Sequence, residues 1–180
     1  MDKPKVQERE ETEEKPQIFK KVLLGAFTII VILMLIFYFM TTPLMQGIII
    51  GLFESSTVDK NAVGIGQGKM LFFEDNTYDR LMGIYDKNPE REFKVCLIGR
   101  TNNGNYFINE VFEPKMIYQD VDKVIAEPCP DETLVSLHSH PFRQCLPSEV
   151  DLNNFELIKK KNNNTLMAVM CERGRFNFYR

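Results

Sequence analysis

Residues 137–151 read LHSHPFRQCLPSEVD. His138 and His140 are the only histidines in the chain, and they lie two residues apart. Because side chains at positions i and i+2 of a strand point to the same face, we expect both imidazoles side by side at the end of a strand. Asp151 follows His140 by eleven residues, enough for the chain to fold back. Two imidazoles and one carboxylate are a donor set typical of catalytic zinc, with the fourth position open to water.

Each part of this pattern has a simpler explanation. A single H-x-H in a strand is more often structural or exposed than metal-binding. Ser148 and Asp151 also have the spacing of a capping box, in which a helix N-cap and its third residue bond reciprocally. Both explanations hold together if the helix N-terminus fixes Asp151 and leaves one carboxylate oxygen free for a metal. A cap alone accounts for Ser148 and Asp151 but not for the histidines.

Taken whole, the pattern His138-x-His140-Pro141-x6-Ser148-x2-Asp151 resembles the signature of the JAMM (MPN-plus) zinc metalloproteases. That signature has an upstream glutamate, then H-S/T-H-P, then serine and aspartate at this spacing. The resemblance covers roughly residues 69–180. It implies a JAMM-like mixed α/β domain of a prokaryotic-type member, with one Zn²⁺ per chain held by His138, His140 and Asp151.

The resemblance also implies two catalytic residues. The family's glutamate lies at the start of the strand after the first helix, and Glu92 fits this place, 46 residues before His138. Glu92 is then the general base that takes a proton from water and returns it to the leaving amine. Zinc lowers the pKa of that water toward about 7 and polarises the scissile carbonyl. Ser148 donates a hydrogen bond to the tetrahedral oxyanion. The rival glutamates are Glu90, Glu110 and Glu113.

Hydrophobic periodicity gives the other elements of the domain. Alternating or continuous apolar runs predict strands at 69–73, 93–99, 106–112, 132–140, 165–171 and 175–179. Apolar residues three and four apart predict a helix over 76–86, and a second helix is expected over 148–161. Asn102-Asn103-Gly104 predicts a hairpin turn. We therefore expect a largely antiparallel sheet flanked by helices.

The N-terminal part predicts one membrane anchor. Residues 1–21 carry six acids and six bases, and we expect a polar disordered tail. Residues 22–53 contain no charged side chain. The first 19 of them, 22–40, reach about 28 Å as a helix, close to the hydrocarbon thickness of about 30 Å. The rest, up to residue 53, is too short to span again and is either an interfacial segment or an extension of a tilted helix. Residues 54–68 are expected to be a linker.

A cleaved signal peptide is the competing interpretation. It normally has a short positive leader and a small-x-small cleavage site. Here a 21-residue leader of mixed charge precedes the apolar run, and no convincing site follows Met40. We therefore expect a single-pass membrane protein that contacts lipid through residues 22–53. Lys20 and Lys21 directly before the helix favour the tail inside and the catalytic domain outside.

The compartment also bears on the four cysteines. Cys96 and Cys171 fall in expected apolar strands, where buried free thiols are the default. Cys129 and Cys145 lie in expected loops and could pair outside the cytosol. Connectivity cannot be read from sequence, so the disulfide state is left open.

Substrate and partners follow from the resemblance. Eukaryotic members cleave isopeptide bonds to ubiquitin, and prokaryotic members act on ubiquitin-like or small sulfur-carrier proteins. Only 29 residues follow Asp151, which leaves little room for the insertion that grips ubiquitin. We expect an isopeptidase or peptidase that removes ubiquitin-like modifiers. The alternatives are an exported peptidase of cell-surface peptides and a non-catalytic membrane scaffold. A net charge of −3 and a pI of about 5.5 argue against nucleic acid as a partner.

Overall fold

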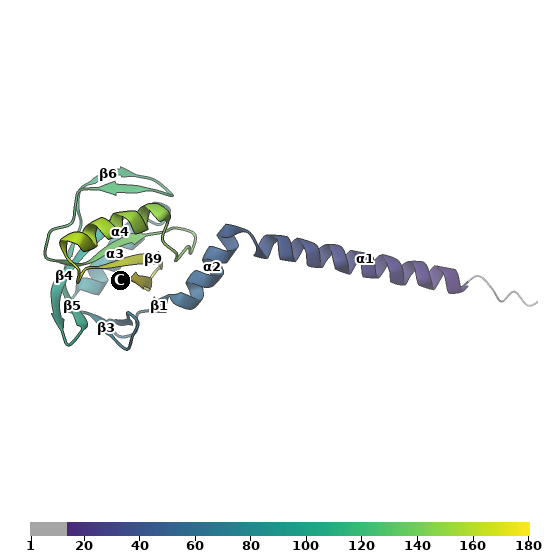
Figure 1. The fold of residues 1–180 in the computed structure, drawn as a ribbon, viewed down its shortest axis with the longest axis horizontal. Coiled ribbons are helices and arrows are strands. Elements are labelled where there is room, and N and C mark those ends of the chain that lie inside the picture. Colours follow the sequence, from purple (N-terminus) through teal and green to yellow (C-terminus); the bar gives the residue numbers. More distant parts are fainter. Residues whose placement is uncertain (1–13) are drawn as a thin grey trace, which may run out of the picture. The chain divides into compact units, whose positions relative to one another are not determined.

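A computed structural model describes residues 14–180, which divide after Thr42 into two units (Figure 1). The first unit contains helix α1 (Glu14–Met40). Its stretch Gln17–Met40 is 24 residues long and is apolar enough to cross a membrane, by length and composition. Every side chain of this stretch is exposed. The helix therefore has the properties of either a single membrane span or a signal sequence.

The polar tail is shorter than the sequence suggested. Residues 14–21, expected in the disordered tail, form the first turns of α1, and residues 1–13 lie outside the described part. Helix propagation adds one hydrogen bond for each residue fixed, so an apolar helix readily extends into a polar flank. Pro16 stands in the first turn, where a helix tolerates the missing N–H.

The second unit begins with a separate helix, α2 (Pro43–Glu54). The hydroxyls of Thr41 and Thr42 donate to carbonyls of the last turn of α1, and Pro43 then starts the new helix. The apolar extension to residue 53 is therefore a distinct helix rather than a continuation. Among residues 45–54 of this helix, the buried positions are Gly47 and Gly51.

The main sheet has eight strands in the order β1-β10-β9-β8-β4-β5-β3-β2. The pairs β8/β9 and β3/β5 are parallel, and the other five pairs are antiparallel. Its end strands β1 and β2 touch, so the sheet is nearly closed and barrel-like. The strands are β1 (Ser56–Thr57), β2 (Ala62–Gly64), β3 (Met70–Phe73), β4 (Lys94–Asn102), β5 (Asn105–Phe112), β8 (Thr133–Ser139), β9 (Leu166–Glu172) and β10 (Arg175–Tyr179).

Four short strands were absent from the sequence prediction. β1 and β2 lie within residues 54–68, which is therefore part of the sheet and not a linker. Val63 of β2 is 1% exposed and belongs to the core. The others, β6 (Met116–Gln119) and β7 (Val124–Ala126), form a separate two-stranded ribbon. Strands of two to four residues carry too little periodicity to be recognised, and tertiary pairing determines them.

The longer predicted elements are confirmed within a few residues at each end. Asn103 and Gly104 have φ values of 49° and 78°, so the β4–β5 turn has the two positive φ angles of a type I′ hairpin. The helices are α3 (Thr77–Lys87) and α4 (Glu149–Lys161). The architecture is mixed α/β with a mixed sheet, as the sequence predicted at this level.

The two faces of the central strands β4 and β8 have different surroundings. Val95 of β4 and Leu137 of β8 are fully buried in the core, together with Leu81 of α3. The alternate residues, Lys94 and His138, face the other way and line a small cavity with the α4 side. One face of the sheet therefore builds the core, and the opposite face carries the polar groups of the site.

Candidate metal centre

The two histidines lie at the end of β8, at the middle of the sheet. His138 pairs with Lys94 of β4 and with Val169 of β9. The backbone N–H of His140 donates to the carbonyl of Met170 at 2.9 Å, which continues the pairing with β9 beyond the last strand residue. Both imidazoles are buried, and their ring centroids are 4.8 Å apart. The expectation that both rings share one face is confirmed.

Asp151 enters from the first turn of α4. Ser148 is the N-cap of this helix, and its hydroxyl accepts the Asp151 N–H at 3.2 Å. In return, Asp151 Oδ2 accepts the Ser148 N–H at 2.8 Å, which completes a capping box. The local sequence therefore fixes the carboxylate at the start of the helix, whether or not a metal is bound.

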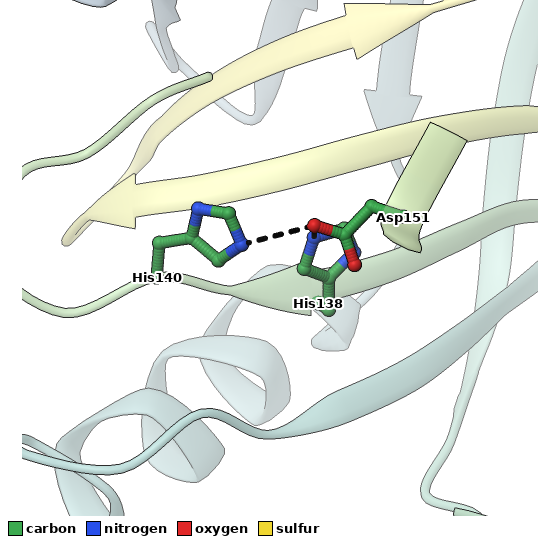
Figure 2. Close-up of side chains that lie close together, drawn as sticks. All are labelled: His138, His140 and Asp151. Carbon is green, nitrogen blue, oxygen red and sulfur yellow. Dashed lines mark ion pairs between the residues drawn. The ribbon is translucent and has the colours of Figure 1, made fainter. Parts of the chain in front are cut away.

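The three donor groups meet with spacings that suit a metal ion (Figure 2). Asp151 Oδ2 lies 3.4 Å from His138 Nε2 and 3.5 Å from His140 Nε2. Zinc bonds of about 2.0–2.2 Å at tetrahedral angles separate neighbouring donor atoms by about 3.3–3.6 Å. His138 Nε2 is buried and has no hydrogen-bond partner among the described residues. A buried orphan nitrogen within such a triangle is what a metal would satisfy, so this group could hold a metal ion.

Glu92 lies beside the three donors. Its Oε1 atom is 3.6 Å from His140 Nε2, and its side chain is buried. Its backbone N–H donates to the Asp120 carbonyl at 2.9 Å, which fixes the approach to β4. The pKa of Glu92 is raised to about 7, mainly by burial and also by the negative charge of Asp151, while His140 opposes the shift. The rival glutamates at 90, 110 and 113 are all exposed.

The ionisation of His138 and Asp151 suits a metal, whereas the pKa of His140 is shifted the other way. Burial lowers the pKa of His138, and contact with Asp151 only partly offsets this effect. Burial also lowers the pKa of His140, but the Asp151 contact and the charge of Glu92 outweigh it and raise the pKa overall. Burial opposes ionisation of Asp151, yet the two imidazoles and Ser148 hold its pKa well below the usual range. Metal ligation requires an ionised carboxylate and neutral imidazole.

The Ser148 hydroxyl has a partner of its own. Its Oγ donates to Asp151 Oδ2 at 2.6 Å. A hydroxyl carries one hydrogen, so in this arrangement it cannot also donate to a substrate oxyanion. The structure gives Ser148 a positioning contact with Asp151. The oxyanion role requires the hydroxyl to turn away from Asp151, and it stays a prediction.

Two residues near the site were not singled out from sequence. Ser139 faces away from the histidines, and its Oγ accepts the Phe93 N–H at 3.0 Å, which fixes the chain next to Glu92. Lys94 lies opposite His138, and burial lowers its pKa. A lysine inside an apolar strand, two residues after the expected base, was the available signal for Lys94. Ser139 fills the S/T position of the H-S/T-H-P signature, but that match did not indicate its role.

All four cysteines form disulfides, Cys96–Cys129 and Cys145–Cys171. The expectation of buried free thiols at Cys96 and Cys171 was therefore wrong. Cys129 and Cys145, which the sequence left as one possible pair, are each bonded to another cysteine. The parallel pairing of β8 with β9 brings Cys171 next to the loop that follows His140. Cys129 instead lies in the segment between β7 and β8 and reaches β4.

A cleft of about 1350 Å³ opens beside the donor group. Glu92, His140, Ser148 and Asp151 line one part of it. Residues of α4 and the segment 121–131, which includes β7, line much of the remainder. Exposed apolar side chains along this cleft include Leu157 and Ile125. The cleft is large enough to accommodate several residues of a peptide.

The assignment of this site rests on its own residues and geometry. His138, His140 and Asp151 converge from a strand end and a helix start, with Glu92 beside them. Neither comparison with models of known protein families nor comparison with curated proteins gives a match to this chain.

Proposed function

We propose that this chain is a zinc metallopeptidase of the JAMM type, anchored in a membrane by α1. The observation that carries the proposal is the convergence of His138, His140 and Asp151 with Glu92 beside them. The H-S-H-P and Ser-x-x-Asp spacing supports the same family. The order of the larger elements agrees with it. Helix α3 is followed by the β4–β5 hairpin, by strand β8 with the histidines, by α4 and by the β9–β10 hairpin.

Each residue of the proposed site has a separate chemical role. Zn²⁺ held by the three donors would supply a Lewis acid and lower the pKa of a water molecule toward about 7. Glu92, with a pKa of about 7, accepts the proton of that water and returns it to the leaving amine. Ser148 holds Asp151 in the capping box, and the backbone bond from Glu92 to Asp120 holds the base in place.

The cleft of about 1350 Å³ beside the donor group favours a polypeptide as the substrate. The family resemblance favours an (iso)peptide bond at the tail of a ubiquitin-like or other small modifier protein. The two disulfides favour a second candidate, a peptide or protein outside the cytosol. Disulfides persist in oxidising compartments, and the flanking charges of α1 direct the second unit outward. On these grounds an exported peptidase becomes the better-supported of the two substrate assignments.

The experiment that tests the proposal is a zinc measurement on the full chain in detergent, for wild type, Asp151→Ala and Glu149→Ala. Glu149 is the matched control, because it is an exposed acid in the same first turn of α4. We expect about one zinc per chain in wild type and in the control, and a loss in Asp151→Ala. Wild-type protein that stays metal-free in excess zinc would remove the enzyme proposal and favour a scaffold.

Hydrolysis then separates an enzyme from a metal-binding scaffold. The zinc-loaded chain is incubated with a quenched peptide library and with ubiquitin-like fusion proteins. Chelation should abolish cleavage, and added zinc should restore it. Zinc-loaded protein that cleaves neither kind of substrate would favour a scaffold that retains a structural metal.

A further inference from the structure

The loop that follows His140 returns to the same histidine. His140 Nδ1 lies 3.1 Å from the carbonyl oxygen of Gln144. A carbonyl can only accept, so this contact requires the proton on Nδ1. The lone pair is then on Nε2, the atom that faces Asp151 and the metal centre. The Gln144 carbonyl therefore selects the tautomer that can bind a metal.

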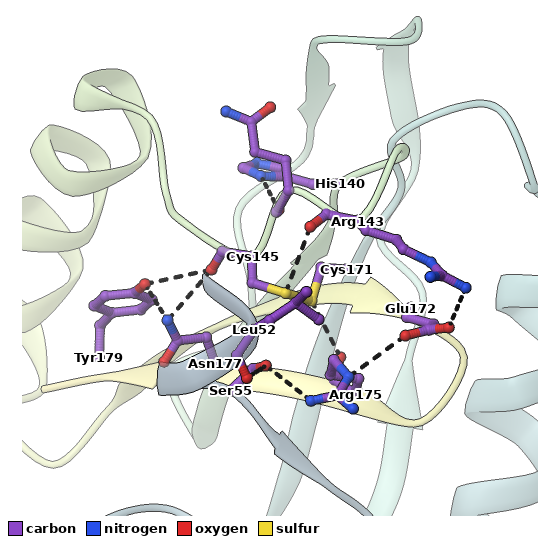
Figure 3. Close-up of a disulfide and its surroundings, with 11 residues drawn as sticks. Leu52, Ser55, His140, Arg143, Cys145, Cys171, Glu172, Arg175, Asn177 and Tyr179 are labelled. Carbon is purple, nitrogen blue, oxygen red and sulfur yellow. Dashed lines mark hydrogen bonds and ion pairs between the residues drawn. A yellow bond between two sulfur atoms is a disulfide. The ribbon is translucent and has the colours of Figure 1, made fainter. Parts of the chain in front are cut away.

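A disulfide fixes that carbonyl. Cys145, the residue after Gln144, is bonded to Cys171 of β9 (Figure 3). Cys171 directly follows Met170, whose carbonyl accepts the backbone N–H of His140 at 2.9 Å. These contacts form a closed circuit. The His140 backbone binds β9, the disulfide joins β9 to Cys145, and the neighbouring Gln144 carbonyl contacts the His140 ring.

Further contacts hold Cys145 itself. Its carbonyl accepts from Asn177 Nδ2 at 3.3 Å and from the Tyr179 hydroxyl at 3.4 Å (Figure 3). Helix α2 packs directly against it, because a Cβ added at Gly51 would lie 2.7 Å from the Cys145 Cβ. Cys145 is completely buried, so these contacts hold it within the packed interior.

The loop between His140 and Cys145 supplies little restraint of its own. Phe142 and Arg143 have φ values of 62° and 59°, a region that L-residues rarely adopt. The Phe142 side chain is 71% exposed and contributes little packing. Arg143 is tied to Glu172 by an exposed ion pair at 2.9 Å. A strained, exposed loop needs an external fixed point to hold one carbonyl in place, and Cys145 is that point.

We propose that the Cys145–Cys171 disulfide is a positioning element of the metal centre. It holds the Gln144 carbonyl against His140 Nδ1 and thereby sets the affinity for the metal. This inference rests on the metal centre proposed above. Loss of an outer hydrogen-bond partner of a metal ligand typically weakens metal binding by about 10–100-fold. The second disulfide, Cys96–Cys129, joins β4 to a different loop and makes no such circuit, so it is a matched control.

The test compares the zinc dissociation constants of the full chain in detergent, measured by competition with a chromogenic chelator. The variants are Cys145→Ser/Cys171→Ser and Cys96→Ser/Cys129→Ser. We expect zinc binding at least about tenfold weaker in the first and within about threefold of wild type in the second. Equal, wild-type affinity in both would overturn the inference. Wild-type protein without zinc affinity would instead remove the metal centre itself, and the inference with it.

A second pair of variants moves the loop without breaking a sulfur bond. Gly51→Ala places a methyl group against Cys145, whereas Gly47→Ala meets no atom closer than 3.9 Å. Both changes are Gly→Ala in the same helix. We expect weaker zinc binding in Gly51→Ala only, and equal affinities in the two variants would count against the inference. This pair decides the question if the double serine variant fails to fold.

A spectroscopic measurement distinguishes a loss of His140 ring positioning from a general loss of structure. Because the chain has only two histidines, ¹⁵N-labelled imidazole gives a spectrum of two rings. In the oxidised, metal-free wild type we expect the His140 proton on Nδ1. In the Cys145→Ser/Cys171→Ser variant we expect the Nε2–H tautomer to gain population, while the Cys96→Ser/Cys129→Ser variant keeps the wild-type signal. An unchanged His140 tautomer in the first variant would show that the disulfide does not position the ring.

Discussion

The Oε1 atom of Glu92 lies 3.6 Å from the Nε2 atom of His140, at the point where the approach to β4 meets the end of β8. At this distance the carboxylate is next to the donor triangle without being one of its three corners. A group in that place can exchange a proton with a water molecule at the centre of the site. The first prediction follows from this separation of roles.

Glu92→Gln should retain zinc and lose catalysis. The amide cannot accept the proton, and general-base catalysis typically contributes about 10²–10⁴-fold to the rate. We therefore expect zinc stoichiometry equal to wild type, and peptide hydrolysis lower by at least about 100-fold. The control is Glu90→Gln, an exposed glutamate two residues away. Wild-type turnover in Glu92→Gln would show that another group is the base.

The contribution of Glu92 to the stability of the metal-free protein should fall as the pH rises from about 4.5 to 7. The Glu92 pKa is raised from 4.5 to about 7, so in this window the folded protein retains a proton that the unfolded chain has lost. Stability decreases with pH wherever the folded state binds more protons. The difference between the two pKa values corresponds to about 3 kcal/mol at most.

Denaturant unfolding of chelator-treated wild type and Glu92→Gln at pH 5 and pH 8 measures this contribution. The variant lacks the ionisable group, so we expect it to gain stability relative to wild type at pH 8 and not at pH 5. The comparison reports the Glu92 carboxyl together with its interaction with His140. Parallel pH profiles for wild type and variant would contradict a raised pKa.

Ser148→Ala should weaken both the helix start and the metal centre. Removing a serine N-cap typically costs about 1 kcal/mol, and here it also removes the hydrogen bond from Ser148 Oγ to Asp151. We expect a lower free energy of unfolding and zinc binding weaker by about tenfold. Ser148→Thr retains the hydroxyl and should preserve both properties. If Ser148→Ala lowers turnover while zinc affinity and stability stay at wild-type values, the serine acts on the substrate instead.

The second unit should be accessible from outside an intact cell. After treatment with an impermeant reductant, the thiol of Cys129, which is partly exposed, should react with an impermeant maleimide. A Lys5→Cys variant supplies the opposite control, because its tail should react only after the cells are permeabilised. A reduced second unit that stays unlabelled in intact cells would place the site in the cytosol. In that case the modifier-protein substrate would become the favoured assignment.

The donor set was predictable because its chemistry is concentrated in a few positions. Period-two geometry placed His138 and His140 on one face, and the capping pattern placed Asp151 at a helix start. Glu92 depended on the family resemblance, since by itself it is a carboxylate before a strand. Its burial and its contact with His140 are products of the register between β4 and β8.

Other features could not be predicted because they depend on tertiary neighbours. β1 contains two residues, and only its pairing with β10 makes it a strand. Cys145 and Cys171 are 26 residues apart, and nothing local links them. Their bond follows from the parallel pairing of β8 with β9, which are distant in the sequence. The orientation of His140 by Gln144 uses a backbone carbonyl, which every residue type possesses.

The pairing of β1 with β10 has a consequence for the order of synthesis. Ser55, directly before β1, receives a hydrogen bond from Arg175 of β10, and these two residues are 120 positions apart. Until β10 has been synthesised, β1 has no pairing partner and β9 lacks its neighbour on that side of the sheet. Contacts between such distant segments form slowly, because a long loop must close first. The nascent chain therefore carries an incomplete sheet, and protection from edge-to-edge aggregation is needed most during that interval.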